Sequence, residues 1–207
     1  MSNSKNILLG YSGHAYVVAE AAEKAGISID YYADKVKVQN DPLNLNYMGF
    51  EGSDNFKGWG KDFGFILGVG DNKIRTNLGD LVKSKNELLR TIIHPAAEIS
   101  NSATIGEGTF ISAHATINAL SKIEKYVVLN TNCTIEHECH IDEGVHISPG
   151  AVLAGNVAVG KGSFIGANAV VKEGITIGVN VIVGAGATII QDIPDGKKVV
   201  GNPGREI

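Results

Sequence analysis

The chain has 207 residues and a formal net charge of −4 at pH 7, with a pI near 5.8. This acidic balance offers no basic surface for a nucleic acid and no lysine-rich run for a membrane surface. The N-terminal stretch MSNSKNILLG has too few apolar residues for a signal peptide, and nothing approaches a transmembrane span. We expect a cytoplasmic protein with room for one large domain or two small ones.

The first 35 residues alternate strand and helix signals. Residues 5–10 (KNILLG) predict a short buried strand, residues 14–25 predict a helix that stops at Gly26, and residues 27–34 predict a second strand. This order opens a βαβ unit, so a parallel, Rossmann-like sheet is expected. The turn Ser12-Gly13-His14 lacks the Gly-x-Gly-x-x-Gly fingerprint of dinucleotide sites. Free amides at the helix start suit an anion, but a plain strand-to-helix turn explains the spacing equally well.

Residues 36–61 have no clear period and are rich in glycine, asparagine and aspartate. Such a long segment is uncommon in a compact domain unless it binds a ligand or adds short edge strands. Further on, residues 63–69 (FGFILGV) predict a third buried strand, and residues 88–93 predict a last one. Between them, Asp71 can cap a helix whose apolar face is formed by Ile74, Leu78, Leu81 and Val82.

From Ile93 to Ile189 an aliphatic residue returns at every sixth position without a break. A strict hexapeptide period is typical of a parallel β-helix, whose inward aliphatics pack against the coils above and below. A coil built from hexads has three flat faces, so about sixteen hexads give roughly five turns. We therefore expect an α/β domain over residues 1–90 and a β-helix over residues 91–207. In the tail, Pro194 and Pro203 argue against a central strand.

Cys133 and Cys139 lie one hexad apart, each two positions before an inward aliphatic. A redox pair or a set of metal ligands would be the functional interpretation. Alanine and serine fill the same position in other coils, so we favour small buried residues of the β-helix core.

The outward positions of the β-helix are mostly small or polar, with one exception between Asn130 and His146. This segment holds three of the six histidines together with four carboxylates. His137 follows an inward isoleucine by two positions, which predicts a place near a corner and an outward side chain. Because Glu136 and Glu138 can orient its ring and stabilise the imidazolium, a general base is the favoured interpretation.

Two alternatives compete for this cluster. Zinc needs three or four convergent ligands, and the spacing of His137, His140 and His146 matches no common zinc motif, so we expect no metal. A solvated charged face explains Asp142 and Glu143 well, but it explains a histidine between two glutamates poorly.

The Ser-Gly-His turn, the hexads, the N-x6-H-[DE] spacing, the HISPGA and GAGA stretches and the terminal GNP together resemble the NeuD/PglD-like bacterial sugar acyltransferases. The resemblance covers essentially the whole chain. It implies an α/β, Rossmann-like N-terminal domain followed by an all-β, left-handed parallel β-helix. It also implies an acetyl-CoA-dependent enzyme that forms a homotrimer with active sites between subunits.

The resemblance assigns roles position by position. His137 matches the general base, and Glu138 matches the acidic residue that raises its basicity. Neighbours in the same active-site motif are Asn130 and Glu136. The positions that match acetyl-CoA contacts are His146, Gly155, Ala167 and Ala185. The positions that match the acceptor-sugar site are Ser12, Gly13, His14, Asp34 and Lys35.

The acceptor is the least defined part of this resemblance. Family members that use nucleotide sugars often carry an acidic run after the second strand, whereas this chain has Ala33-Asp34-Lys35. The expected reaction is direct acetyl transfer to the amino group of a nucleotide-linked sugar of the UDP-4-amino-4,6-dideoxy type. O-acetylation of a sialic acid or another glycan sugar is an alternative. Two other classes remain: a β-helix that binds or scaffolds without catalysis, and a metal-dependent hydratase with histidines donated across subunits.

Overall fold

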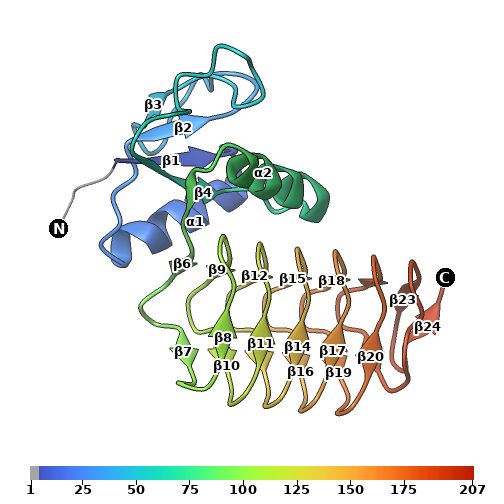
Figure 1. The fold of residues 1–207 in the computed structure, drawn as a ribbon. Helices are drawn as coiled ribbons and strands as arrows, with labels where there is room; N and C mark the ends of the chain where they lie inside the picture. Colours follow the sequence, from blue (N-terminus) through green and yellow to red (C-terminus); the bar gives the residue numbers. More distant parts are fainter. Residues whose placement is uncertain (1–4) are drawn as a thin grey trace.

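The computed structural model covers residues 5–207, so the first four residues of the N-terminal stretch lie outside the described part of the chain. The first half is a five-stranded, fully parallel sheet in the order β3-β2-β1-β4-β5. Two helices, α1 and α2, accompany it (Figure 1). The elements are β1 (Lys5–Leu9), α1 (Gly13–Lys24), β2 (Tyr31–Ala33), β3 (Asn46–Tyr47), β4 (Phe63–Leu67), α2 (Asn72–Ser84) and β5 (Leu88–Leu89).

The alternation of side chains along β1 explains how both helices are held. Leu8 packs in one apolar cluster with Val18 of α1, whereas Ile7 and Leu9 pack in another with Leu78 of α2. The helices therefore cover opposite faces of the sheet. The predicted parallel, Rossmann-like winding is confirmed.

The segment 36–61 contributes β3, which pairs with β2 as a short edge strand, one of the two alternatives predicted for it. Two predictions for this half need correction. The strand predicted over residues 88–93 is two strands, because β5 pairs with β4 whereas the next strand pairs within the β-helix. On α2, Ile74 is 52% exposed and Arg75, only 1% exposed, is turned inward in its place.

The second half is a parallel β-helix of two-residue strands. Successive strands belong in turn to three parallel sheets, so every third strand lies in the same sheet. Paired residues such as Thr116 and Thr134 are 18 positions apart, which is three hexads per coil. The strands are β6 (Ile92–Ile93), β7 (Glu98–Ile99), β8 (Thr104–Ile105), β9 (Phe110–Ile111), β10 (Thr116–Ile117), β11 (Lys122–Ile123), β12 (Val128–Leu129), β13 (Thr134–Ile135), β14 (His140–Ile141), β15 (His146–Ile147), β16 (Val152–Leu153), β17 (Ala158–Val159), β18 (Phe164–Ile165), β19 (Val170–Val171), β20 (Thr176–Ile177), β21 (Ile182–Val183) and β22 (Thr188–Ile189). We name the sheets after their first strands, the β6, β7 and β8 sheets, and each corner of the prism after the two sheets that it joins.

The inward residues form one apolar core along the β-helix. The second residue of each strand points inward, and small residues two positions earlier fill the space at the corners. Cys133 and Cys139 are both buried there as free thiols, as predicted. Burial raises the pKa of the Cys133 thiol to about 12, so it stays protonated and unreactive.

The tail does form a strand in the interior of a sheet, contrary to the prediction. Strand β23 (Lys198–Val200) pairs with β21 on one side and with β24 (Arg205–Glu206) on the other. Pro194 and Pro203 lie outside both strands, so neither removes a hydrogen bond from the ladder.

The α/β half packs on the β6 sheet at one end of the β-helix (Figure 1). The first outward residues of this sheet, Ile92, Phe110 and Val128, are buried in the same cluster as α1. The next outward residues in the row are His146, Phe164 and Ile182, and exposure rises to 43% at Ile182. The row therefore passes from an interdomain contact to an open surface. No helix in residues 5–207 has the length and apolar character to cross a membrane.

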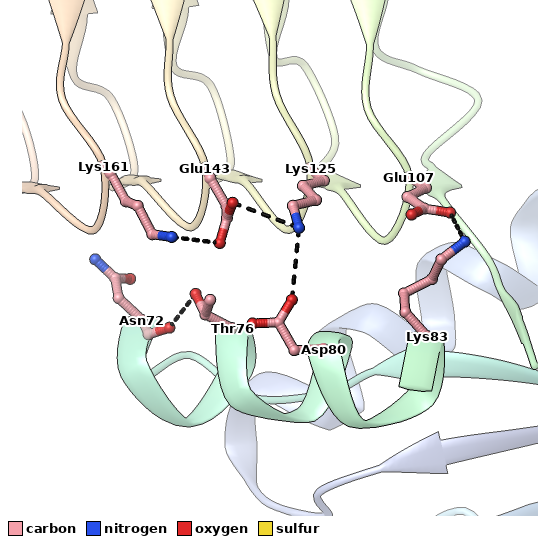
Figure 2. Close-up of polar contacts among 8 residues, drawn as sticks. All are labelled: Asn72, Thr76, Asp80, Lys83, Glu107, Lys125, Glu143 and Lys161. Carbon is pink, nitrogen blue, oxygen red and sulfur yellow. Dashed lines mark hydrogen bonds and ion pairs between the residues drawn. The ribbon is translucent and has the colours of Figure 1, made fainter. Parts of the chain in front are cut away.

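Helix α2 lies along the β8–β6 corner, where Figure 2 shows a row of polar contacts. Lys83 pairs with Glu107 at 2.9 Å. One coil further, Lys125 lies 3.5 Å from both Asp80 and Glu143. These pairs are partly exposed, so each contributes no more than about 1 kcal/mol and the row mainly fixes the register of helix and coils.

Candidate active site

An open groove of about 1050 Å³ lies between α2 and the outward surface of the β6 sheet. His14, at the start of α1, and His146, on β15, both line it. Their ring centroids are 6.1 Å apart. Phe164, from the next coil, lines the groove and packs edge-on against His146 at 5.1 Å. The groove thus joins the turn after β1 to the histidine-rich segment, which are 132 residues apart from His14 to His146.

The Ser12-Gly13-His14 turn is not closed by its own side chains. Ser12 is the N-cap residue, yet its side chain makes no capping hydrogen bond, and the first turn has no acidic residue. A side chain on Gly13 would meet no heavy atom within 4 Å. His14 packs edge-on against Phe110, and its Nε2 is buried without a hydrogen-bond partner among residues 5–207. The turn therefore leaves the start of α1 without a side-chain cap and, within the described part of the chain, one ring nitrogen of His14 without a partner.

Asp34 braces this turn from the end of β2. Its Oδ2 accepts a hydrogen bond from the Tyr11 amide at 2.8 Å, and its Oδ1 accepts one from the Lys35 amide at 2.6 Å. Both carboxylate oxygens are thus used by the backbone, and the Lys35 side chain is exposed beside them. The sequence-predicted acceptor residues do come together, with Asp34 in a supporting place.

Asn130 and His146 are linked by a hydrogen bond that fixes both side chains. The Nδ1 of His146 lies 3.3 Å from the Gly70 carbonyl, which can only accept, so Nδ1 carries the proton. Its Nε2 lies 3.3 Å from the Asn130 amide nitrogen. The other end of that amide, Oδ1, accepts from the Thr131 backbone at 2.8 Å. Both ring nitrogens of His146 are committed, which leaves it poorly suited to donate to an oxyanion.

Both groove histidines are neutral at pH 7. Burial, and secondarily the positive charge of Arg75, lowers the pKa of His146 to about 4 and that of His14 to about 4. The unfolded chain has histidines with a pKa near 6.5. The stability linked to these histidines is therefore complete above pH 6.5 and is lost as the pH falls toward 4.

We predict that acidification from pH 7.0 to 5.5 lowers the free energy of unfolding by about 1 kcal/mol for each of the two histidines. Urea unfolding at both pH values measures this change. The His14→Gln, His146→Gln double variant should lose correspondingly less over the same interval. Equal losses in the wild type and in the variant would contradict the prediction.

His137 lies at the β7–β8 corner, with half of its side chain exposed. Its Nδ1 lies 3.2 Å from Oε2 of Glu138, and its backbone amide lies 3.4 Å from Oε2 of Glu136. A carboxylate only accepts, so Glu138 holds the proton on Nδ1 and leaves Nε2 with its lone pair. An exposed imidazole oriented in this way can act as a base.

Gly155 lies directly beside His137, one coil further along the chain. A side chain on Gly155 would place its Cβ 2.4 Å from Cε1 and 2.6 Å from Nε2 of the ring. Ala167 and Ala185 lie instead at the β6–β7 corner, where the Gly186 amide donates to the Ala167 carbonyl. Gly155 thus makes room for the histidine, whereas the two alanines present small side chains along another corner.

The predicted site residues form two groups on one chain. His14, Asn130 and His146 gather beside the groove on the β6 sheet, whereas His137, Glu138 and Gly155 occupy the β7–β8 corner. Within residues 5–207, no hydrogen bond or ring contact joins His137 to the first group. The two groups therefore occupy different parts of the chain's surface, one at the β6 sheet and one at the β7–β8 corner.

The three histidines weighed as zinc ligands do not converge in one chain. His140 is exposed on the β8 sheet and His146 is on the β6 sheet, with His137 at a corner. Among the described residues, no group of three or more His, Cys, Asp or Glu is arranged to hold a metal ion.

Sequence reasoning missed Gly70, Arg75 and Phe164. Counting one coil forward would have found Phe164, because it is 18 residues after His146 and therefore its neighbour on the β6 sheet. The same count would have placed Gly155 beside His137. No local signal marks Gly70 or Arg75, since the contacts that tie them to the β-helix, to Tyr126 and His146, are with residues more than 50 positions away.

Two protein families match the chain: the PglD N-terminal domain over residues 5–81, and the hexapeptide repeat of succinyl-transferase over residues 156–191. The UDP-N-acetylbacillosamine N-acetyltransferase of Bacillus subtilis is 43% identical over 49 residues, which span 24% of this chain and 23% of the length of that protein.

Solved structures are similar over the whole chain. The acetyltransferase domain of PglB from Neisseria gonorrhoeae, in complex with acetyl coenzyme A, is 35% identical, with 100% of both chains covered and a TM-score of 0.90. PerB from Caulobacter crescentus, in complex with CoA and GDP-perosamine, is 30% identical, with 99% of this chain and 97% of that chain covered and a TM-score of 0.89. The predicted fold class, including the left-handed β-helix, is confirmed.

Proposed function

The chain belongs to the PglD-like family of bacterial hexapeptide-repeat sugar acetyltransferases, and we propose that it transfers an acetyl group from acetyl-CoA to the amino group of a nucleotide-linked amino sugar. We propose a UDP-linked 4-amino-4,6-dideoxy sugar as the acceptor. The observation that carries the proposal is the exposed His137, oriented by Glu138 at a corner where Gly155 leaves room for the ring. The names of the relatives support the same chemistry, with UDP in one and GDP in another.

His137 acts in this proposal as the general base. Its Nε2 takes the proton that the amine loses as the amine nitrogen bonds to the thioester carbonyl carbon. The C–S bond then breaks, and CoA leaves as a thiol after taking up one proton. Glu138 stabilises the imidazolium that forms in between. Backbone amides are better placed than His146 to stabilise the oxyanion, because both ring nitrogens of His146 are already bonded.

The donor would lie along the β-helix and the acceptor against the α/β domain. Small side chains at Ala167 and Ala185 fit a pantetheine arm that needs close approach to the backbone. The open turn at Ser12-Gly13-His14, braced by Asp34, fits the anionic or sugar part of the acceptor. The exposed Lys35 adds a cation beside that turn. Because the proposed donor and acceptor, acetyl-CoA and a nucleotide sugar, are cytoplasmic metabolites, we propose a cytoplasmic location.

We propose further that the active site forms between protomers of a homotrimer. One chain carries the base at the β7–β8 corner and the groove residues at the β6 sheet, so neither group completes a site alone. A neighbouring copy that presents its β7–β8 corner to the groove would bring His137 to His14, Asn130 and His146. Such an arrangement uses the flat faces of the prism for symmetric contacts.

A thiol-release assay with acetyl-CoA tests the proposal directly. The acceptor panel holds UDP-, GDP- and dTDP-linked amino sugars, their hydroxyl counterparts and free sialic acid. The proposal expects thiol release with a UDP-linked 4-amino sugar and none with its hydroxyl counterpart. Release with sialic acid alone would favour O-acetylation. No release with any acceptor, together with no rise in melting temperature on adding acetyl-CoA, would favour a non-catalytic β-helix.

A further inference from the structure

Arg75 is a buried charge without an ion pair. It projects inward from α2 with 1% of its surface exposed, and none of the ion pairs in residues 5–207 includes it. Its guanidinium donates to the carbonyls of Tyr126 at 2.8 Å and Gly144 at 2.9 Å, which belong to successive coils. It also donates to Oδ1 of Asn72 at 2.9 Å. Burial lowers its pKa to about 10, so it remains charged at pH 7.

The same guanidinium reaches the groove through Gly70. Nη1 of Arg75 donates to the Gly70 carbonyl at 2.8 Å, and that carbonyl also accepts from Nδ1 of His146 at 3.3 Å. The Gly70 carbonyl is therefore fixed between a buried cation and the imidazole. Through His146, the chain of contacts continues to the Asn130 amide.

We propose that Arg75 is the positioning residue of this site: its guanidinium fixes the Gly70 carbonyl, and this carbonyl selects one tautomer and one orientation of His146. The expected effect of Arg75 on acetyl transfer rests on the proposed function, whereas its expected effect on the tautomer and orientation of His146 does not. A buried arginine costs free energy that an apolar residue at this position would not. The planar guanidinium explains why an arginine stands here, because no neutral side chain donates that many hydrogen bonds in one plane.

The charge of Arg75 acts on the groove histidines in the same direction. It lowers the pKa of both His146 and His14, in each case after burial. The charged side chains that line the groove are Asp71 at the N-cap of α2, Lys73 and Asp80 on α2, and Lys161 on a coil of the β-helix. With Arg75 in place, Nε2 of His146 keeps its lone pair for the Asn130 amide throughout the neutral range.

A purely structural role for Arg75, as a tie between α2 and two coils, predicts a different result. It would lower stability, but it would leave the protonation and the tautomer of His146 unchanged in folded protein. Lys83→Ala is the matched control, because it removes an ion pair between the same helix and the coils without contact to Gly70 (Figure 2).

The test uses full-length Arg75→Lys and Arg75→Met with histidine-¹⁵N long-range NMR across pH 4–8. In the wild type and in Lys83→Ala, we expect His146 to be protonated only at Nδ1 down to about pH 5. Arg75→Lys keeps the charge but lacks the planar fork, so its His146 should show mixed tautomers at an unchanged pKa. Arg75→Met should show mixed tautomers and a raised pKa; if it does not fold, Arg75→Lys decides alone.

Kinetics provides the second readout. We compare kcat/KM of Arg75→Met with that of the wild type at pH 8 and at pH 5.5. The activity of the variant relative to the wild type should fall by about threefold or more at pH 5.5, because only the variant gains a protonated His146. A single Nδ1–H tautomer in both Arg75 variants, with a pH-independent ratio, would overturn the proposal. If the wild type transfers no acetyl group, the proposed function fails, whereas the NMR result still decides the role of Arg75.

Discussion

Replacement of His137 with alanine lowers kcat for acetyl transfer by about 10²–10⁴-fold and leaves the melting temperature nearly unchanged. The rate falls because the amine must lose its proton as it attacks, and no other base lies at this corner with a free ring nitrogen. Stability is kept because half of the His137 side chain is exposed and its backbone bonds do not depend on the ring. Steady-state thiol release with saturating acetyl-CoA measures the effect.

The matched control is His140→Ala, which removes an exposed histidine three residues away on β14. We expect this control to keep close to wild-type turnover. Glu138→Gln should fall between the two, since it keeps a hydrogen-bond acceptor but loses the charge that stabilises the imidazolium. Near wild-type turnover in His137→Ala would exclude the base mechanism.

Substitution of Gly155 by alanine lowers kcat by about 10–100-fold through displacement of the His137 ring. The added methyl group would lie 2.4 Å from Cε1, which is far inside van der Waals contact, so the ring must move. Gly155 has no positive φ, and alanine therefore causes no backbone strain. Thiol release measures kcat, and urea unfolding checks that the free energy of unfolding is preserved.

A double-mutant cycle separates this steric effect from any direct loss of donor binding. In a His137→Ala background, Gly155→Ala should add nothing to the loss, because no ring remains to be displaced. An additional loss in that background would show that Gly155 contacts the donor, as the family resemblance first implied.

The β-helix was predictable because every coil repeats the same physical problem. A residue such as Ile135 must fill the core at the same place as Ile117 one coil earlier, so the period is visible without any knowledge of the partner. The buried cysteines follow from the same logic. Strand β23 was missed because the prolines of the tail were read as if they lay within a strand, whereas they flank it.

The site was predictable in its residues but not in its grouping. His137 was recognisable because charged neighbours are unusual in this β-helix. Arg75 could not be recognised, because helical periodicity places Ile74 on the apolar face, and the distant carbonyls of Tyr126 and Gly144 help to make an inward arginine acceptable. Tertiary hydrogen bonds of this kind override local pattern, and they are absent from any short stretch of sequence.

The central claim, an acetyltransferase site shared between copies of the chain, is tested most directly by mixing two inactive variants. His137→Ala and His146→Ala protomers are co-expressed with different tags, and doubly tagged oligomers are isolated and assayed for thiol release. If one copy supplies His137 and its neighbour supplies His146, each doubly tagged trimer has both intact residues at one of its three sites, so its activity returns to about a third of wild type. Mixed oligomers that stay as inactive as either parent would contradict a shared site, because every chain would then carry one defect within its own site.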